Sequence, residues 1–136
     1  QTCALPISSI TETFDPTMFA RLSDDIGALD RLADSLAVAG GGDQLKLVCQ
    51  RYYYASLVAC IENLCLSPHG VSSIERSARL HDMLEAQRTR QMVAALKGNH
   101  RGLGLLYGSI AGAKPMRCAL YTHLAAFFNR SGVRTV

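Results

Sequence analysis

The chain has 136 residues, a length that indicates one domain large enough to bury an ordinary core. Hydrophobic residues make up 49% of the chain and charged residues 18%, a composition that excludes an intrinsically disordered protein. The net charge of +3 is uneven, because residues 1–43 hold two basic and seven acidic groups whereas residues 44–136 hold twelve and four. This asymmetry predicts either an acidic first helix packed beside basic ones or a basic face for a polyanion.

Residues 1–8 resemble the in-frame translation of a sequencing-library adaptor, and they lack the charged and apolar regions of a signal peptide. We therefore expect a non-native leader over residues 1–8 and a single domain over residues 9–136, with truncation of a longer protein as an open alternative. No run reaches the roughly 18–20 apolar residues that span a bilayer, so no membrane partner is expected.

The first helix is predicted to start at Asp15, which can cap it, and at Pro16, which suits the first helical position. Phe14 and Phe19 are spaced to form a hydrophobic staple. The apolar stripe of this helix recurs every three or four residues and consists of Met18, Leu22, Ile26, Leu29, Ala33 and Leu36. Three consecutive glycines, residues 40–42, are expected to end it.

Two long helices are predicted next. The segment from Asp43 to Leu66 is apolar nearly all round from Tyr52 onward, a pattern typical of a central, buried helix. A Ser-Pro-His-Gly break follows at residues 67–70. The next helix opens with Ser72 and Glu75 in the pattern of a capping box and continues to about Lys97, with a kink expected near residue 87.

Glycines interrupt the apolar segment from Gly102 to Ala113. The main prediction is a helix in which Gly104, Gly108 and Gly112 line one face against a neighbouring backbone, and a flexible loop is the alternative. Gly102 and Gly104 do not form a dinucleotide-binding motif, because a tyrosine replaces the third glycine and a helix precedes the segment.

The last helix is expected from Lys114 and Pro115 to about residue 129, with an inward stripe of Met116, Leu120, His123 and Phe127. Five helices with short connections and no alternating strand pattern predict an all-α fold. The expected architecture is an antiparallel bundle of about five helices in a single domain.

The cysteines predict free thiols. Besides Cys3, the chain has Cys49, Cys60, Cys65 and Cys118, with no CxxC pair, which fits buried thiols in a reducing cytoplasm. Cys60, Cys65 and His69 are chemically suitable zinc ligands, but the cysteines point to different sides of one helix and no fourth ligand is evident. Neither a metal nor a cofactor is therefore expected.

Acidic and nucleophilic residues give little sign of catalysis. Glu62 lies in the mostly buried second helix, and it is expected to pair with an arginine such as Arg51 or Arg79. The alternative is a general acid or base with a raised pKa. No Gly-x-Ser-x-Gly nucleophile elbow occurs.

The segment Arg51-Tyr52-Tyr53-Tyr54-Ala55-Ser56, with apolar residues to Cys65, resembles the aromatic patch of HEPN domains over about residues 44–128. The resemblance implies a small helical bundle, and many members of that family cleave RNA in toxin–antitoxin or defence systems. Their signature is an arginine followed four to six residues later by a histidine.

Two pairs fit that spacing, Arg76 with His81 and Arg117 with His123, and the second lies nearer the family's usual place. Cys118 stands where a polar residue commonly follows the arginine. The resemblance thus implies a metal-independent ribonuclease, acting across a dimer, in which Arg117 binds the scissile phosphate and His123 transfers a proton.

The leading hypothesis is a non-catalytic helical interaction module. Its expected surface is a basic face that would bind an RNA or DNA backbone or an acidic protein, and it consists of Arg76, Arg79, Arg88, Arg90, Lys97 and Arg101. The alternatives are the HEPN-like ribonuclease, with a homodimer as partner, and a structural fragment of a larger protein. The fragment would expose an apolar patch, expected along Gly104, Gly108 and Gly112.

Overall fold

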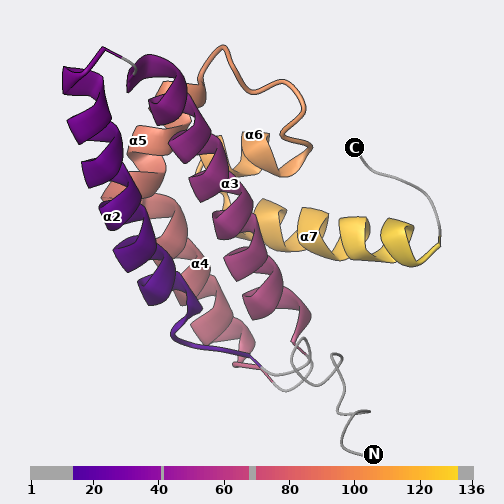
Figure 1. The fold of residues 1–136 in the computed structure, drawn as a ribbon. Coiled ribbons are helices and arrows are strands. Elements are labelled where there is room, and N and C mark those ends of the chain that lie inside the picture. The colour runs from indigo at the N-terminus through magenta and orange to yellow at the C-terminus, as the bar shows by residue number, and fades with distance from the viewer. Residues whose placement is uncertain (1–13, 41, 68–69, 132–136) are drawn as a thin grey trace, which may run out of the picture.

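The computed structural model describes residues 14–40, 42–67 and 70–131, and this part of the chain is helical without any strand (Figure 1). Its helices are α2 (Met18–Val38), α3 (Gly42–Leu66), α4 (Ser73–Glu85), α5 (Gln87–Leu96), α6 (Leu106–Ala111) and α7 (Pro115–Arg130). The predicted all-α class is confirmed. The expected leader, residues 1–8, and His69 lie outside the described residues. None of these helices is long and apolar enough to cross a membrane.

Helices α2 and α3 form an antiparallel pair (Figure 1). The predicted stripe of α2 is buried at Leu22, Ile26 and Ala33, whereas Leu36 near the helix end is 44% exposed. The helix begins later than its sequence predicts, because the Asp15 carboxylate accepts a hydrogen bond from the Thr17 backbone N–H, 2.9 Å away, and so closes a turn before the first helical residue.

The turn between α2 and α3 depends on glycine. Gly40 adopts a φ of +96°, in the left-handed region that glycine tolerates best. Gly42 starts α3 directly against Ala37, so a Cβ at residue 42 would clash with both the Cα and the Cβ of Ala37. Gly40 therefore follows the end of α2, as predicted, and Gly42 lets α3 turn back at close range, whereas Gly41 lies outside the described residues.

Helix α3 is the centre of the fold, as predicted. It packs against α2, α4, α5 and α7, so every long helix touches it. Its fully buried side chains include Tyr53, Leu57, Ile61 and Leu64. The Tyr53 hydroxyl lies 2.9 Å from the Thr89 hydroxyl of α5, which satisfies the polar end of an otherwise apolar residue.

The predicted third helix is divided into two helices, α4 and α5, by a break at Ala86. Ser72 caps α4 by accepting a hydrogen bond from the Glu75 N–H at 3.2 Å, as expected. After the break, the Thr89 hydroxyl donates to the Met83 carbonyl at 2.7 Å and Arg90 Nε donates to the Leu84 carbonyl at 2.9 Å. These side chains satisfy carbonyls that the end of α4 leaves open, which stabilises the predicted kink.

The glycine-rich segment is a loop followed by a short helix, so the prediction of one helix from Gly102 to Ala113 is wrong in extent. Gly102 and Gly104 have φ values of +80° and +86°, which a right-handed helix does not contain. A Cβ at Gly104 or Gly108 would meet no atom within 4 Å, so these glycines do not receive a neighbouring backbone. The nearest neighbours of a Cβ at Gly112 would be the Gly108 carbonyl and the Lys114 side chain, so the predicted face of Gly104, Gly108 and Gly112 does not pack against a neighbouring helix.

Helix α7 has the predicted bounds but faces the opposite way. The inward stripe expected for it is exposed, since Met116 is 84%, Leu120 55% and Phe127 61% accessible. Cys118 and Thr122 face the core instead, where they are almost fully buried. Because α7 is apolar on most sides, periodicity did not select a face, and the smaller side chains allow the closer approach to α3 and α4.

Candidate functional site

Arg88 of the predicted basic face is a structural residue. Its guanidinium donates to the Asp30 carboxylate at 2.9 and 3.2 Å and to Gln50 Oε1 at 2.7 Å, and it lies 4.8 Å from the centroid of the Tyr53 ring. These contacts connect α5 to α2 and α3. The side chain is only 17% exposed, so it offers little charge to a partner.

Arg90 is also turned inward. Besides the Leu84 carbonyl, its guanidinium donates to the carbonyls of Ala111, at 2.9 Å, and Ile110. One cation thus caps the carboxyl ends of α4 and α6, where the negative end of the helix dipole favours it.

Arg79 and Arg76 are engaged on α4. Arg79 forms an ion pair with Glu75 at 3.0 Å and stacks 5.2 Å from the Phe14 ring centroid. Arg76 is half-buried, and its Nε finds no hydrogen-bond acceptor in the described part of the chain. Four of the six predicted residues therefore serve intramolecular contacts or are partly buried, and the predicted basic face is not one continuous free surface.

The exposed basic residues lie further along the chain. Residues 86–136 contain eight basic and no acidic residues. The cations of this region that are exposed and pair with no carboxylate among the described residues are Lys97, Arg101, Lys114, Arg117 and Arg130. Sequence reasoning identified the first two as part of this surface but missed Lys114 and Arg130, although the absence of acidic residues was visible in the sequence.

Arg117 and His123, the predicted catalytic pair, are both exposed on α7. Six residues at about 100° each separate their directions by about 120° around the helix axis, so one chain does not bring them together in a cleft. In the other pair with this spacing, His81 is exposed beside Asp82, with 3.9 Å between Nδ1 and Oδ1. The ribonuclease role of Arg117 and His123 stays a prediction.

The outer face of α7 carries a continuous apolar row, the α7 stripe, which we define as Met116, Leu120, Leu124 and Phe127. Their spacing of four, four and three residues places them on one side of the helix. Each is at least 40% exposed. A row of this kind has the spacing of a helix–helix contact surface, but here it faces solvent.

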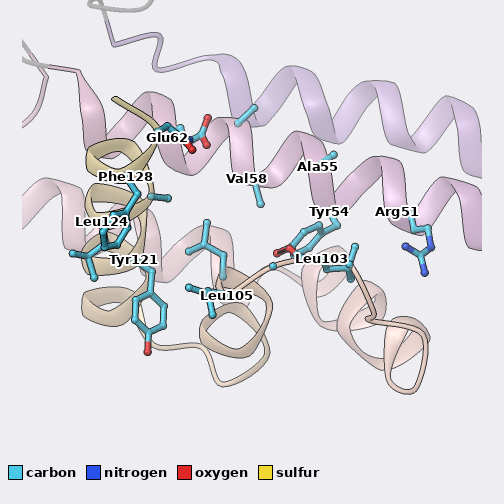
Figure 2. Close-up of a pocket in the computed structure, with 16 residues that line it drawn as sticks. Arg51, Tyr54, Ala55, Val58, Glu62, Leu103, Leu105, Tyr121, Leu124 and Phe128 are labelled. Atoms are coloured by element: carbon cyan, nitrogen blue, oxygen red, sulfur yellow. Dashed lines mark hydrogen bonds between the residues drawn. The ribbon is translucent and has the colours of Figure 1, made fainter. Parts of the chain in front are cut away.

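Beside this stripe lies a groove of about 570 Å³ between α3, the 102–106 segment and α7 (Figure 2). Its walls are mainly apolar and include Val58, Leu103, Leu105, Leu124 and Phe128. The Tyr54 hydroxyl donates to the Leu103 carbonyl at 2.7 Å and so fixes the loop wall against α3. Burial raises the pKa of Tyr54 to about 12, so this donor stays protonated.

Two charged groups lie at the groove, Arg51 and Glu62 (Figure 2). The predicted pairing of Glu62 with Arg51 or Arg79 is wrong, because Arg51 donates to the Asn99 carbonyl at 2.8 Å and Arg79 pairs with Glu75. The Glu62 carboxylate has neither a hydrogen bond nor an ion pair with any described residue. Partial burial raises the pKa of its carboxyl group above the ordinary value.

The cysteines of the described residues are buried inside the helical core. Cys49, Cys60, Cys65 and Cys118 are free and buried, and desolvation raises the pKa of the last three to about 11. A thiol with so high a pKa is a poor nucleophile at neutral pH. In the described ranges, no three His, Cys, Asp or Glu side chains gather where they would hold a metal ion.

The site thus consists of an apolar stripe, an adjoining groove and unpaired charges around both, an arrangement suited to binding. Comparison of the chain with protein-family models, with curated proteins and with solved structures gives no match in any of the three.

Proposed function

We propose that the protein is a non-catalytic helical interaction module that binds an acidic amphipathic helix of a partner protein along the α7 stripe. The exposure of Met116, Leu120, Leu124 and Phe127 in one row carries this proposal. Helix-in-groove recognition uses apolar anchors at this spacing, and an aromatic anchor such as Phe127 commonly contributes a large share of the binding energy.

Charge selects the kind of partner. Helix α7 contains Arg117 and Arg130 but no acidic residue, and Lys114 immediately precedes it. A second copy of the chain would bring these cations against their own counterparts, whereas a helix with glutamates beside its apolar row would pair with them. A nucleic acid would also satisfy the cations, but its phosphates would gain nothing from the aliphatic side chains between them.

The test uses a fluorescein-labelled peptide of about 18 residues, long enough to form a helix, with leucines spaced three and four apart and flanking glutamates. Fluorescence anisotropy should report saturable binding to the 136-residue chain. A matched peptide with lysines in place of the glutamates should bind at least about tenfold more weakly, because its charges repel α7. Leu120→Asp should weaken binding of the acidic peptide at least about tenfold.

Val38→Asp is the matched control, because Val38 is 91% exposed on α2, away from α7, and its replacement should not change binding. Equal affinity for the two peptides, or unchanged affinity in Leu120→Asp, would contradict the proposal. Binding of labelled single-stranded RNA that falls log-linearly with salt and survives Leu120→Asp would favour the nucleic-acid alternative instead. RNA cleavage that disappears in His123→Ala would favour the ribonuclease.

A further inference from the structure

We propose that the groove between α3, the 102–106 segment and α7 is a binding site for a small apolar molecule that carries a protonated amine, with Glu62 as the anion that receives it. This site is separate from the helix-binding role of the α7 stripe, with which it shares only Leu124. The size of the groove, its apolar walls and the unpaired carboxylate support it.

The dimensions and walls fit a small ligand. A volume of about 570 Å³ falls within the range of small-molecule sites, which are commonly apolar with a few polar groups that fix orientation. Three separate segments converge on the groove, with Val58 from α3, Leu105 from the loop and Phe128 from α7 (Figure 2). A flat or flexible molecule with an apolar body would bury its surface against all three.

Glu62 determines the charge of the ligand. Figure 2 shows its carboxylate at the α7 end of the groove, close to Phe128. The side chain is more than one third accessible, yet no cation of the described residues pairs with it. A carboxylate beside apolar walls is incompletely solvated, so an ammonium group on the ligand would be bound more strongly here than at an open surface.

Arg51 sets the direction of binding. It lies eleven residues before Glu62 on α3, or about 16 Å at the rise of an α-helix, and its guanidinium already donates to the Asn99 carbonyl. A second cation near Arg51 would be repelled, so the amine end of the ligand lies at Glu62 and the uncharged end extends toward Arg51. The groove therefore discriminates by charge at both ends.

Two fluorescent probes test the inference on the full 136-residue chain. Dansylcadaverine carries an apolar aromatic body and a primary amine, and N-pentyl dansylamide is its neutral counterpart. In fluorescence titrations near neutral pH, we expect dansylcadaverine to bind at least about tenfold more tightly, a ratio typical of one charge-assisted contact. Glu62→Gln should remove this preference while the affinity for the neutral probe stays the same.

Two further variants locate the site. Ala55 lines the groove and is exposed, so Ala55→Trp should fill part of the groove and weaken the binding of both probes without disturbing the core. Glu85→Gln removes an exposed carboxylate from the end of α4, outside the groove lining, and should change neither affinity. Circular dichroism melting curves would establish that all variants fold.

The outcomes distinguish an amine-binding site at Glu62 from nonspecific binding of the dyes. Equal affinity of the wild-type chain for the two probes, or no binding of either, overturns the inference. It is also overturned by an amine preference that survives Glu62→Gln, or by binding that Ala55→Trp leaves unchanged. Loss of the amine preference in Glu62→Gln alone, with Glu85→Gln unaffected, establishes Glu62 as the amine-binding residue.

Discussion

At the scale of single residues, buried or half-buried arginines stabilise the fold through backbone carbonyls and across helices. Arg90 caps two helices that are more than twenty residues apart in the chain, and Arg88 connects three helices through Asp30, Gln50 and the Tyr53 ring. The sequence predicts that the positive charges of Arg88 and Arg90 lie on the surface. Their inward direction reduces the predicted basic face and leaves the exposed positive charge on the 97–101 segment and on α7.

Replacing Arg90 should therefore destabilise the protein. Arg90→Met keeps much of the apolar stem but leaves the carbonyls of Leu84, Ile110 and Ala111 without their donor. We expect a loss of about 3 kcal/mol in the free energy of unfolding, measured by urea denaturation. Arg101→Met is the matched control at an exposed position, with an expected change below about 0.5 kcal/mol. A loss no larger than that of the control would show that water replaces the guanidinium at these helix ends.

At the scale of elements, one glycine, Gly42, allows two helices to approach closely, whereas the spaced glycines of the 102–113 segment do not. Gly42 lies where α3 turns back against Ala37, whereas Gly108 of α6 faces open space. Both occur in helices, so composition does not distinguish them. Only the position of the neighbouring helix makes one indispensable and the other replaceable.

Opposite effects are expected when the two glycines become alanine. Gly42→Ala should lower the free energy of unfolding by about 1–3 kcal/mol, because the new methyl group forces α2 and α3 apart at their turn. Gly108→Ala should raise it by about 0.5–1 kcal/mol, because alanine favours the helix and meets no atom. Thermal and urea unfolding would measure both. A stabilising Gly42→Ala would mean that the turn relaxes without cost.

At the scale of the whole molecule, the core contains several thiols that stay neutral to a higher pH because the protein is folded. Burial raises the pKa of Cys60, Cys65 and Cys118 from 9.0 to about 11. An unfolded chain loses these protons near pH 9, whereas the folded chain retains them until about pH 11. Folding therefore binds more protons in this range, and stability falls as the pH rises through it.

Alkaline unfolding should follow that window. Urea denaturation from pH 8 to pH 11 should show a free energy of unfolding that is constant below about pH 9 and then falls, with each thiol contributing about 2 kcal/mol by pH 11. A variant with alanine at residues 60, 65 and 118 should be less stable at pH 8, because of the cavities, but should lose less stability on going to pH 11. The same slope in both proteins would assign the alkaline loss to other groups, such as Tyr54.

The helical class, the approximate bounds of α3 and α7, the cap at Ser72 and the kink before α5 were all predictable from the sequence. These follow from local rules of periodicity, capping and breaking residues. The sequence did not reveal that α7 turns Cys118 and Thr122 inward and exposes Leu120 and Phe127, or that Glu62 lies unpaired at a groove, because these depend on how the helices pack. The reason is that a helix apolar on most sides has several faces it can bury, and the choice depends on which neighbours approach it most closely.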